Sequence, residues 1–150
     1  MSDDAVHEGG CLCGAVRYRV RGAPAWVVHC HCQSCRRATG APMVTWVGFA
    51  HDRFEVTRGD PVRFASSPGV ARRFCGRCGT PLTYEAERFP GEVHVTVGSL
   101  DRPEDFPPVG HVWTSARIAW LHLADELPRR PGFGGQGRPS KRTRRGKTAA

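Results

Sequence analysis

The seven cysteines of this 150-residue chain fall into three short clusters. They are Cys11 and Cys13, then Cys30, Cys32 and Cys35, and finally Cys75 and Cys78. Spacings of one or two residues bring two sulfurs close to one ion, and repeated pairs of this kind are typical of zinc sites. An odd number of cysteines cannot all pair as disulfides within one chain, and disulfides are rare in reducing compartments. We therefore predict that these thiols bind metal.

Seven thiolates do not divide evenly between zinc ions. A structural zinc is closed by four protein ligands, whereas a catalytic zinc keeps three and leaves the fourth position open. One division joins Cys11 and Cys13 with Cys75 and Cys78, and leaves Cys30, Cys32 and Cys35. The other joins Cys32 and Cys35 with Cys75 and Cys78, and leaves Cys11, Cys13 and Cys30. The spacing permits both divisions, and each leaves one site with only three thiolates.

Two histidines, His29 and His31, lie beside the middle cluster and could supply an eighth ligand. In an extended segment, successive side chains point to opposite faces. Cys30 and Cys32 would then share one face, and the two histidines would share the other. We expect His29 and His31 to pack or hydrogen-bond on the reverse side, although a bend in the chain would allow an imidazole ligand.

Glycines flank the first and last cysteine pairs, at positions 10, 14, 76 and 79. Their backbone freedom would let N–H groups turn toward the sulfurs. A closed site made from these two pairs would tie the first strand to a hairpin much later in the chain. The binding energy of a structural zinc, on the order of 10 kcal/mol, counts directly as folding energy.

The segments between the clusters predict an all-β fold. Val16, Tyr18 and Val20 alternate with three arginines, which is the period of a half-buried strand. Further strands are expected within residues 43–49, 53–60 and 92–100, with a hairpin over residues 62–75 whose tip is Ser66–Gly69. Short helical turns are expected at Gln33–Thr39 and Pro103–Phe106. We expect Trp46, Trp113 and Trp120 in the core, and we treat His111, Thr39 and Glu85 as structural residues.

The charge of the chain is concentrated near its end. Six of the 22 basic residues lie between Arg138 and Lys147, and the remaining 16 nearly balance the 14 acidic residues. We predict one folded domain over residues 1–133 and a disordered basic tail over 134–150. The tail could touch nucleic acid or an anionic surface, although no dedicated partner is expected. Because no apolar stretch suits a signal peptide or a membrane span, we expect a cytoplasmic protein without a membrane partner.

Four stretches of the chain, in this order, resemble the glutathione-dependent formaldehyde-activating enzyme family, also called the CENP-V/GFA domain family. They are GGCLCGAVRYRV, HCHCQSCRRATGAPMVTWVGF, FCGRCGTPLTY and ADELPRRPGF, and together they span residues 9–133. The resemblance implies an all-β fold of the β-tent type and two zinc ions per chain. It assigns Cys11, Cys13, Cys75 and Cys78 to a structural zinc, and Cys30, Cys32 and Cys35 to a catalytic zinc.

The resemblance also implies a reaction. The family forms S-(hydroxymethyl)glutathione from formaldehyde and glutathione, a reaction classed with the carbon–sulfur lyases. Three thiolates on Zn²⁺ give a net charge of −1, and a substrate thiolate gives −2. Arg36 and Arg37, which follow Cys35, are candidate cations to offset this charge.

Other functions remain open from the sequence. No residue is identified that would grip the carboxylates of glutathione. The alternative function is a non-catalytic zinc module that engages a protein or nucleic-acid partner, and a redox role for Cys35 would require a metal-free site. The sequence assigns no oligomeric state.

Overall fold

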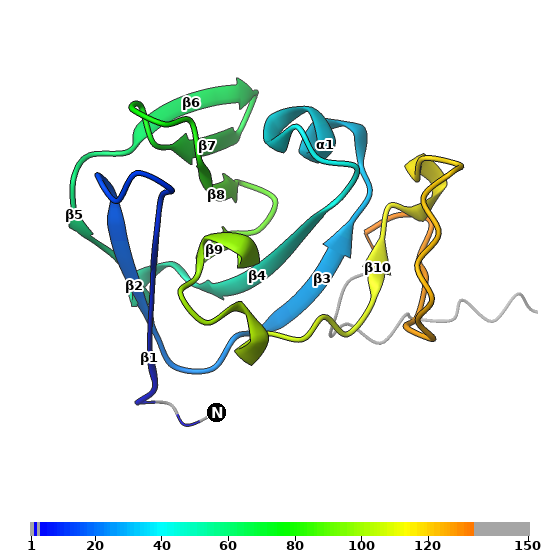
Figure 1. Cartoon of the computed structure of the whole chain (residues 1–150), viewed down its shortest axis with the longest axis horizontal. Helices are drawn as coiled ribbons and strands as arrows, with labels where there is room; N and C mark the ends of the chain where they lie inside the picture. The colour runs from blue at the N-terminus through cyan, green and yellow to red at the C-terminus, as the bar shows by residue number, and fades with distance from the viewer. Residues whose placement is uncertain (1, 3, 134–150) are drawn as a thin grey trace, which may run out of the picture.

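The structure, a computed structural model, describes residue 2 and residues 4–133 (Figure 1). The predicted basic tail, 134–150, lies outside the described residues. Within the described part, ten strands and one α-helix are joined by four 3₁₀ turns. The prediction of an all-β fold with short helical turns is therefore confirmed. No helix in these residues is long and apolar enough to cross a membrane.

A three-stranded antiparallel sheet has the order β1–β2–β5. Its strands are β1 (Val6–Gly10), β2 (Arg17–Arg21) and β5 (Phe54–Arg58). The alternation predicted around β2 is confirmed, because Val16, Tyr18 and Val20 are all buried. This face of β2 supplies one side of the core.

A seven-stranded sheet has the order β10–β3–β4–β9–β8–β7–β6. In chain order its strands are β3 (Trp26–Cys30), β4 (Val44–Ala50), β6 (Val62–Ser67), β7 (Val70–Phe74), β8 (Pro81–Ala86), β9 (Glu92–Thr96) and β10 (His111–Val112). Neighbouring strands are antiparallel except that β10 runs parallel to β3. The hairpin predicted over residues 62–75 is the pair β6–β7, whereas β1, β3, β8 and β10 were not predicted as strands.

The helical segments are short. The α-helix α1 (Gln33–Thr39) directly follows β3, and the 3₁₀ turns are η1 (His51–Arg53), η2 (Val97–Ser99), η3 (Pro103–Asp105) and η4 (Thr114–Ala116). The helical turns predicted at Gln33–Thr39 and near Pro103 are confirmed. The strand predicted over residues 92–100 ends at Thr96, because the chain there turns into η2 and the Leu100 N–H donates to the Val97 carbonyl.

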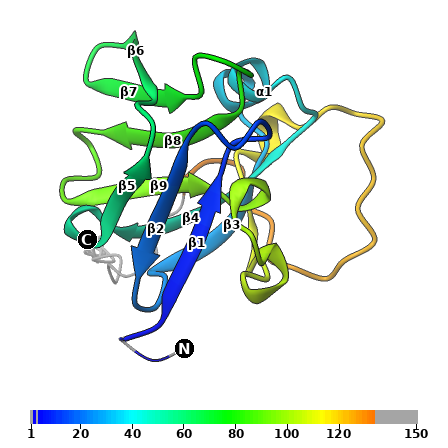
Figure 2. The same ribbon diagram turned by 60° about the vertical axis from the view of Figure 1, so that its left-hand side comes forward.

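The two faces of the seven-stranded sheet differ in what lies against them. One face packs against the three-stranded sheet, which lies in front of β4 and β9 in Figure 2. The core between the sheets includes Tyr18, Val20, Val27, Val47, Phe49, Val93 and Val95. The opposite face carries a second cluster that includes Val28, Cys30, Cys35, Trp46, Tyr84 and Val112. This second face positions the candidate site.

The tryptophans divide between core and surface. Trp46 is buried and Trp113 packs against the second cluster, as predicted. The prediction for Trp120 is wrong, because its side chain is 66% exposed. It lies in the loop after η4, which swings away from both sheets (Figure 2).

Candidate metal centres

Four cysteines meet where two turns come together. Cys11 and Cys13 lie in the turn between β1 and β2, and Cys75 and Cys78 lie in the turn between β7 and β8. Their sulfurs all lie within 4.8 Å of one another, and Cys13 Sγ is 3.6 Å from Cys11 Sγ and 3.8 Å from Cys75 Sγ. Four sulfurs around a tetrahedral zinc, each about 2.3 Å from the ion, are about 3.8 Å apart. The spacing of these sulfurs therefore fits a zinc ion.

The backbone of both turns points N–H groups at the sulfurs. The Val16 N–H donates to Cys11 Sγ at 3.2 Å, and the Arg77 N–H donates to Cys75 Sγ at 3.4 Å. In the first turn Gly14 has φ 72°, a left-handed conformation that glycine adopts without a steric penalty. Such hydrogen bonds stabilise metal-ligating thiolates and fix their orientation.

Thr80 connects the two turns. Its hydroxyl lies 3.2 Å from Cys78 Sγ and accepts a hydrogen bond from the Leu12 N–H of the other turn at 3.1 Å. Hydrogen bonding by the Thr80 hydroxyl and backbone lowers the pKa of Cys78 to about 5. This thiol is therefore predisposed to the thiolate form that metal binding requires.

The other three cysteines meet where β3 passes into α1. Cys30 ends β3, Cys32 precedes the helix and Cys35 lies within it, and their sulfurs are within 4.8 Å of one another. The Cys35 N–H donates to Cys32 Sγ at 3.3 Å. Hydrogen bonds from Cys30 and Cys35 lower the pKa of Cys32, whereas the bond with Cys32 raises the pKa of Cys30. Within the described residues, no further cysteine, histidine or carboxylate joins this group.

The structure thus groups the cysteines four and three. The alternative division, with Cys32 and Cys35 beside Cys75 and Cys78, is not the arrangement found. The donor sets match the two zinc classes, since four thiolates close a tetrahedral site and three leave one position open.

Histidines occupy the reverse side of β3, as predicted. His31 Nε2 lies 2.9 Å from His111 Nδ1, and His29 Nδ1 lies 2.8 Å from Thr45 Oγ1. His111 Nε2 in turn lies 3.1 Å from both carboxylate oxygens of Asp125. Burial lowers the pKa of His31 to about 4, so this ring is neutral near pH 7.

The partners of His31 were not found from the sequence. The sequence identifies His111 only as a structural residue and assigns no role to Asp125, which lies in the ADELPRRPGF stretch. The Asp125 carboxylate can accept a hydrogen bond from the Nε2–H of His111, and His111 Nδ1 can then accept one from the Nε2–H of His31. This chain of contacts fastens the segment around Asp125 to the backbone between Cys30 and Cys32.

A cavity of about 1240 Å³ lies against the three-cysteine cluster. Its lining includes Cys30, Cys32 and Cys35 together with the aromatic rings of Trp26, Trp46, Tyr84, Phe89 and Phe133. The four cysteines of the other cluster do not line it. A large concave site with apolar walls and a few convergent polar groups is typical of small-molecule binding. The three-cysteine cluster is therefore the one that a small molecule can reach from this cavity.

The two arginines next to Cys35 point in different directions. Arg36 Nε donates to the His31 carbonyl and Nη2 donates to the Ala116 carbonyl, both at 3.3 Å, so this side chain braces the backbone. Arg37 is exposed and lines the cavity.

The arginine nearest to the thiols comes from another strand. Arg72 on β7 places Nη2 4.0 Å from Cys35 Sγ, and its guanidinium lies 4.9 Å from the centre of the Tyr84 ring. No sequence signal pointed to this residue, because it lies far from Cys35 in the chain. Its contact depends on strand pairing, since Arg72 is directly opposite Tyr84 in the β7–β8 register.

The chain is similar to known proteins in sequence and in structure. Residues 6–116 match the family model described as glutathione-dependent formaldehyde-activating enzyme. A protein of Halomonas elongata, provisionally named as a glutathione-dependent formaldehyde-activating enzyme, is 31% identical over 129 residues, which cover 77% of this chain and 80% of that protein. A crystal structure of a Rhodobacter sphaeroides protein is 25% identical and superposes with a TM-score of 0.57, over 70% of this chain and 99% of that chain.

The purified protein is expected to hold two zinc ions per chain. The closed four-thiolate set and the three-thiolate set each fit one ion. Elemental analysis after dialysis, normalised to protein concentration, measures the ratio. A ratio of one ion per chain would contradict the four-and-three division.

Two serine variants separate the roles of the clusters. Cys35→Ser is expected to lose one zinc and keep the fold, with a melting temperature within a few degrees of wild type. Cys75→Ser is expected to impair folding, because the energy of a closed zinc site, on the order of 10 kcal/mol, is part of the folding energy. Metal content and circular dichroism melting measure both effects. Equal loss of stability in the two variants would argue against separate structural and reactive sites.

Proposed function

The chain belongs to the glutathione-dependent formaldehyde-activating enzyme family, and from this premise we propose that it catalyses formation or cleavage of an adduct between a thiol and a small aldehyde. The proposed reaction is of the carbon–sulfur lyase type, with a glutathione-like thiol and an aldehyde such as formaldehyde. The observation that carries the proposal is the three-cysteine cluster at the wall of a cavity of about 1240 Å³. A reducing compartment such as the cytoplasm would keep these cysteines and the substrate as thiols.

The chemistry balances without an oxidant or a reductant. In adduct formation the thiol gives up its proton, the sulfur–carbon bond forms, and the π electrons of the carbonyl move to oxygen. That oxygen then takes up a proton, and the product is a hydroxyalkyl thioether. Cleavage runs the same steps in reverse.

The three cysteines are the proposed ligands of the reactive zinc. Bound there, the ion would supply an open coordination position and stabilise the thiolate form of a substrate thiol near neutral pH. Cys30, Cys32 and Cys35 line the cavity, whereas His29 and His31 are held on the reverse side of β3. The protein therefore leaves the fourth position to a molecule that enters through the cavity.

Arg72 is the proposed counter-charge at this end of the cavity. Thiolates and zinc together carry a net −1, and a substrate thiolate would raise this to −2. The Arg72 guanidinium, 4.0 Å from Cys35 Sγ, offsets part of that charge in a site with apolar walls, where charges interact more strongly than in water. The Tyr84 ring beneath the guanidinium holds it in position through a cation–π contact.

Exchange spectroscopy tests the proposed reaction directly. With glutathione and formaldehyde at equilibrium, NMR exchange between free and adduct signals is expected to accelerate in proportion to enzyme concentration, beyond the spontaneous rate. In Cys35→Ser this acceleration is expected to be at least tenfold smaller, because the variant lacks one of the three proposed ligands of the reactive zinc. An exchange rate equal to the spontaneous rate, with both zinc ions bound, would favour the non-catalytic zinc module.

Replacing Arg72 tests the counter-charge. Arg72→Met is expected to lower kcat/KM about tenfold, which corresponds to about 1.4 kcal/mol of transition-state stabilisation. Arg72→Lys is expected to recover part of this loss because it keeps the charge. Arg37→Met is the matched control, since Arg37 lines the same cavity but is exposed, and it is expected to stay within about twofold of wild type. An equal decrease in kcat/KM for Arg72→Met and Arg37→Met would contradict a specific role for Arg72.

A further inference from the structure

One residue, His31, separates the proposed ligands Cys30 and Cys32, and its backbone is held on both sides. The His31 N–H donates to the Val112 carbonyl at 3.1 Å, and the His31 carbonyl accepts from Arg36 Nε at 3.3 Å. The first contact continues the parallel pairing of β10 with β3, and the second comes from α1. The peptide groups that join two of the three thiols are therefore fixed by neighbouring elements.

The ring of His31 is completely buried and has one hydrogen-bonding partner. Its Nε2 lies 2.9 Å from His111 Nδ1, and the two rings stack at 25° with their centroids 5.2 Å apart. Among the residues that the structure describes, none hydrogen-bonds to His31 Nδ1. The orientation of this ring between the two ligands therefore depends on His111.

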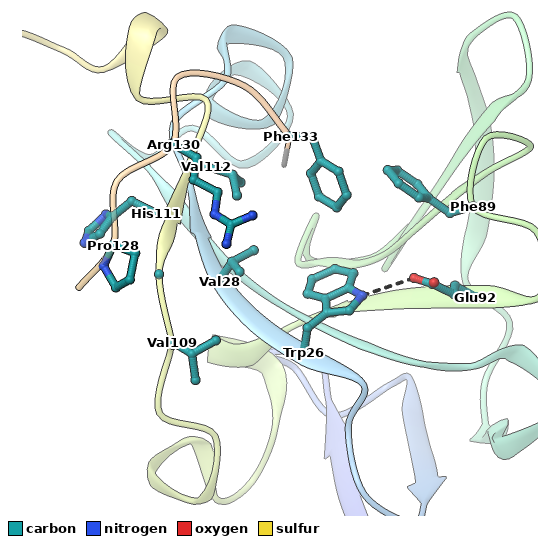
Figure 3. Close-up of a pocket in the computed structure, with 11 residues that line it drawn as sticks. Trp26, Val28, Phe89, Glu92, Val109, His111, Val112, Pro128, Arg130 and Phe133 are labelled. Carbon is teal, nitrogen blue, oxygen red and sulfur yellow. Dashed lines mark hydrogen bonds between the residues drawn. The ribbon is translucent and has the colours of Figure 1, made fainter. Parts of the chain in front are cut away.

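His111 lies behind the site and is held by the segment that follows it. Its N–H donates to the Pro128 carbonyl at 2.8 Å, and its carbonyl accepts from the Arg130 N–H at 2.9 Å. His111 and Val112 project to opposite sides of β10 (Figure 3). Val112 lines the large cavity and His111 does not, so His111 influences the three thiols through His31 and not through the cavity.

The carboxylate of Asp125 completes this chain of contacts. Both of its oxygens lie 3.1 Å from His111 Nε2, and Oδ1 also accepts from the Leu127 N–H at 3.1 Å and from Arg129 Nη2 at 3.2 Å. When the Nε2–H of a neutral imidazole donates to a carboxylate, its lone pair is on Nδ1. Asp125 therefore favours the tautomer of His111 that can accept a hydrogen bond from His31.

The positions of the Cys30 and Cys32 sulfurs depend on the conformation of the residue between them. A tetrahedral zinc ion about 2.3 Å from each sulfur requires sulfurs that are about 3.8 Å apart. A ligand segment that is ordered before the ion arrives loses less conformational freedom on binding, so it binds the ion more tightly. Groups that orient metal ligands from behind can therefore change metal affinity, and their loss typically weakens binding by about 10–100-fold.

We propose that His111 and Asp125 are positioning residues of the three-cysteine site, which act through His31 to hold Cys30 and Cys32 at the separation that one zinc ion requires. This inference rests on the proposed function, whose three-thiolate metal site it extends to two residues outside the lining of the large cavity. The four-cysteine cluster receives its hydrogen bonds from its own two turns, so we expect its affinity to be independent of Asp125.

Release of zinc from each site tests the inference without requiring catalysis. The zinc-loaded full-length protein is mixed with excess 4-(2-pyridylazo)resorcinol, and release is followed by the absorbance of the chelate. Wild type is expected to release its two ions at different rates, and Cys35→Ser, which keeps only the four-cysteine site intact, identifies the phase of that site. Asp125→Ala is expected to accelerate release from the three-cysteine site about tenfold or more, and to leave the other phase within about twofold of wild type.

Further variants separate positioning from a general loss of stability. Asp125→Asn keeps an oxygen that can accept from His111 Nε2, so it is expected to restore most of the wild-type rate. Thr45→Val is the matched control, because it removes the partner of His29, the other histidine on this side of β3, and it is expected to leave both phases within about twofold. His111→Phe keeps a ring but removes the acceptor for His31. It is the second variant, should Asp125→Ala not fold, and the same acceleration is expected.

The outcomes separate this inference from the proposed function. Release from the three-cysteine site at the wild-type rate in Asp125→Ala or His111→Phe would overturn the inference. Equal acceleration of both phases would also overturn it, because a general loss of stability would explain that result. A single zinc ion per chain in wild type would remove the inference together with the proposed function. If release depends on Asp125 as expected but exchange between thiol and adduct is not accelerated, the inference stands and the proposed reaction fails.

Discussion

The alternation of side chains along β3 is the constraint on which the arrangement of this molecule depends. Trp26, Val28 and Cys30 point into the cavity, whereas Val27 enters the core between the sheets and His29 bonds to Thr45. One strand therefore supplies an aromatic ring, an aliphatic side chain and a candidate metal-binding thiol to one face. A slip of one residue in its register would exchange these faces and put His29 in place of Cys30. The pairing of β3 with β4 along its whole length fixes that register.

The four-cysteine cluster acts on a different part of the fold. Its two turns belong to different sheets, since one joins β1 to β2 and the other joins β7 to β8. The sulfurs come together only when the sheets are packed, so the free energy of metal binding adds to that of folding. Leu12 is 90% exposed and Cys13 is exposed, whereas Cys11 and Cys75 are buried, so one edge of the cluster reaches the surface. None of its four cysteines lines the large cavity. A metal bound by the four cysteines would therefore support the fold, whereas one bound by the other three would face the cavity.

Local patterns in the sequence predicted much of this structure, and long-range pairing explains what they missed. The alternation around β2, the hairpin of residues 62–75 and the helical turn after Cys32 depend on neighbouring residues, so they could be read directly. The position of Arg72 beside Cys35 could not be predicted in this way. Successive residues of a helix are rotated by about 100°, so Arg36, next to Cys35, points to backbone carbonyls instead. Arg72 reaches the thiols only because β7 pairs with β8 in one particular register.

Arginines line the large cavity at more than one point. Arg72 lies beside the thiols, and Arg88 donates to the Tyr84 hydroxyl at 2.8 Å with its guanidinium 5.0 Å from the centre of the Phe89 ring. Because the walls of this cavity are largely apolar, these cations favour an anionic sulfur over a neutral or cationic group. A small neutral aldehyde gains nothing from this charge. Selectivity in the proposed reaction must therefore come from the thiol, and the aldehyde needs only to fit beside the sulfur.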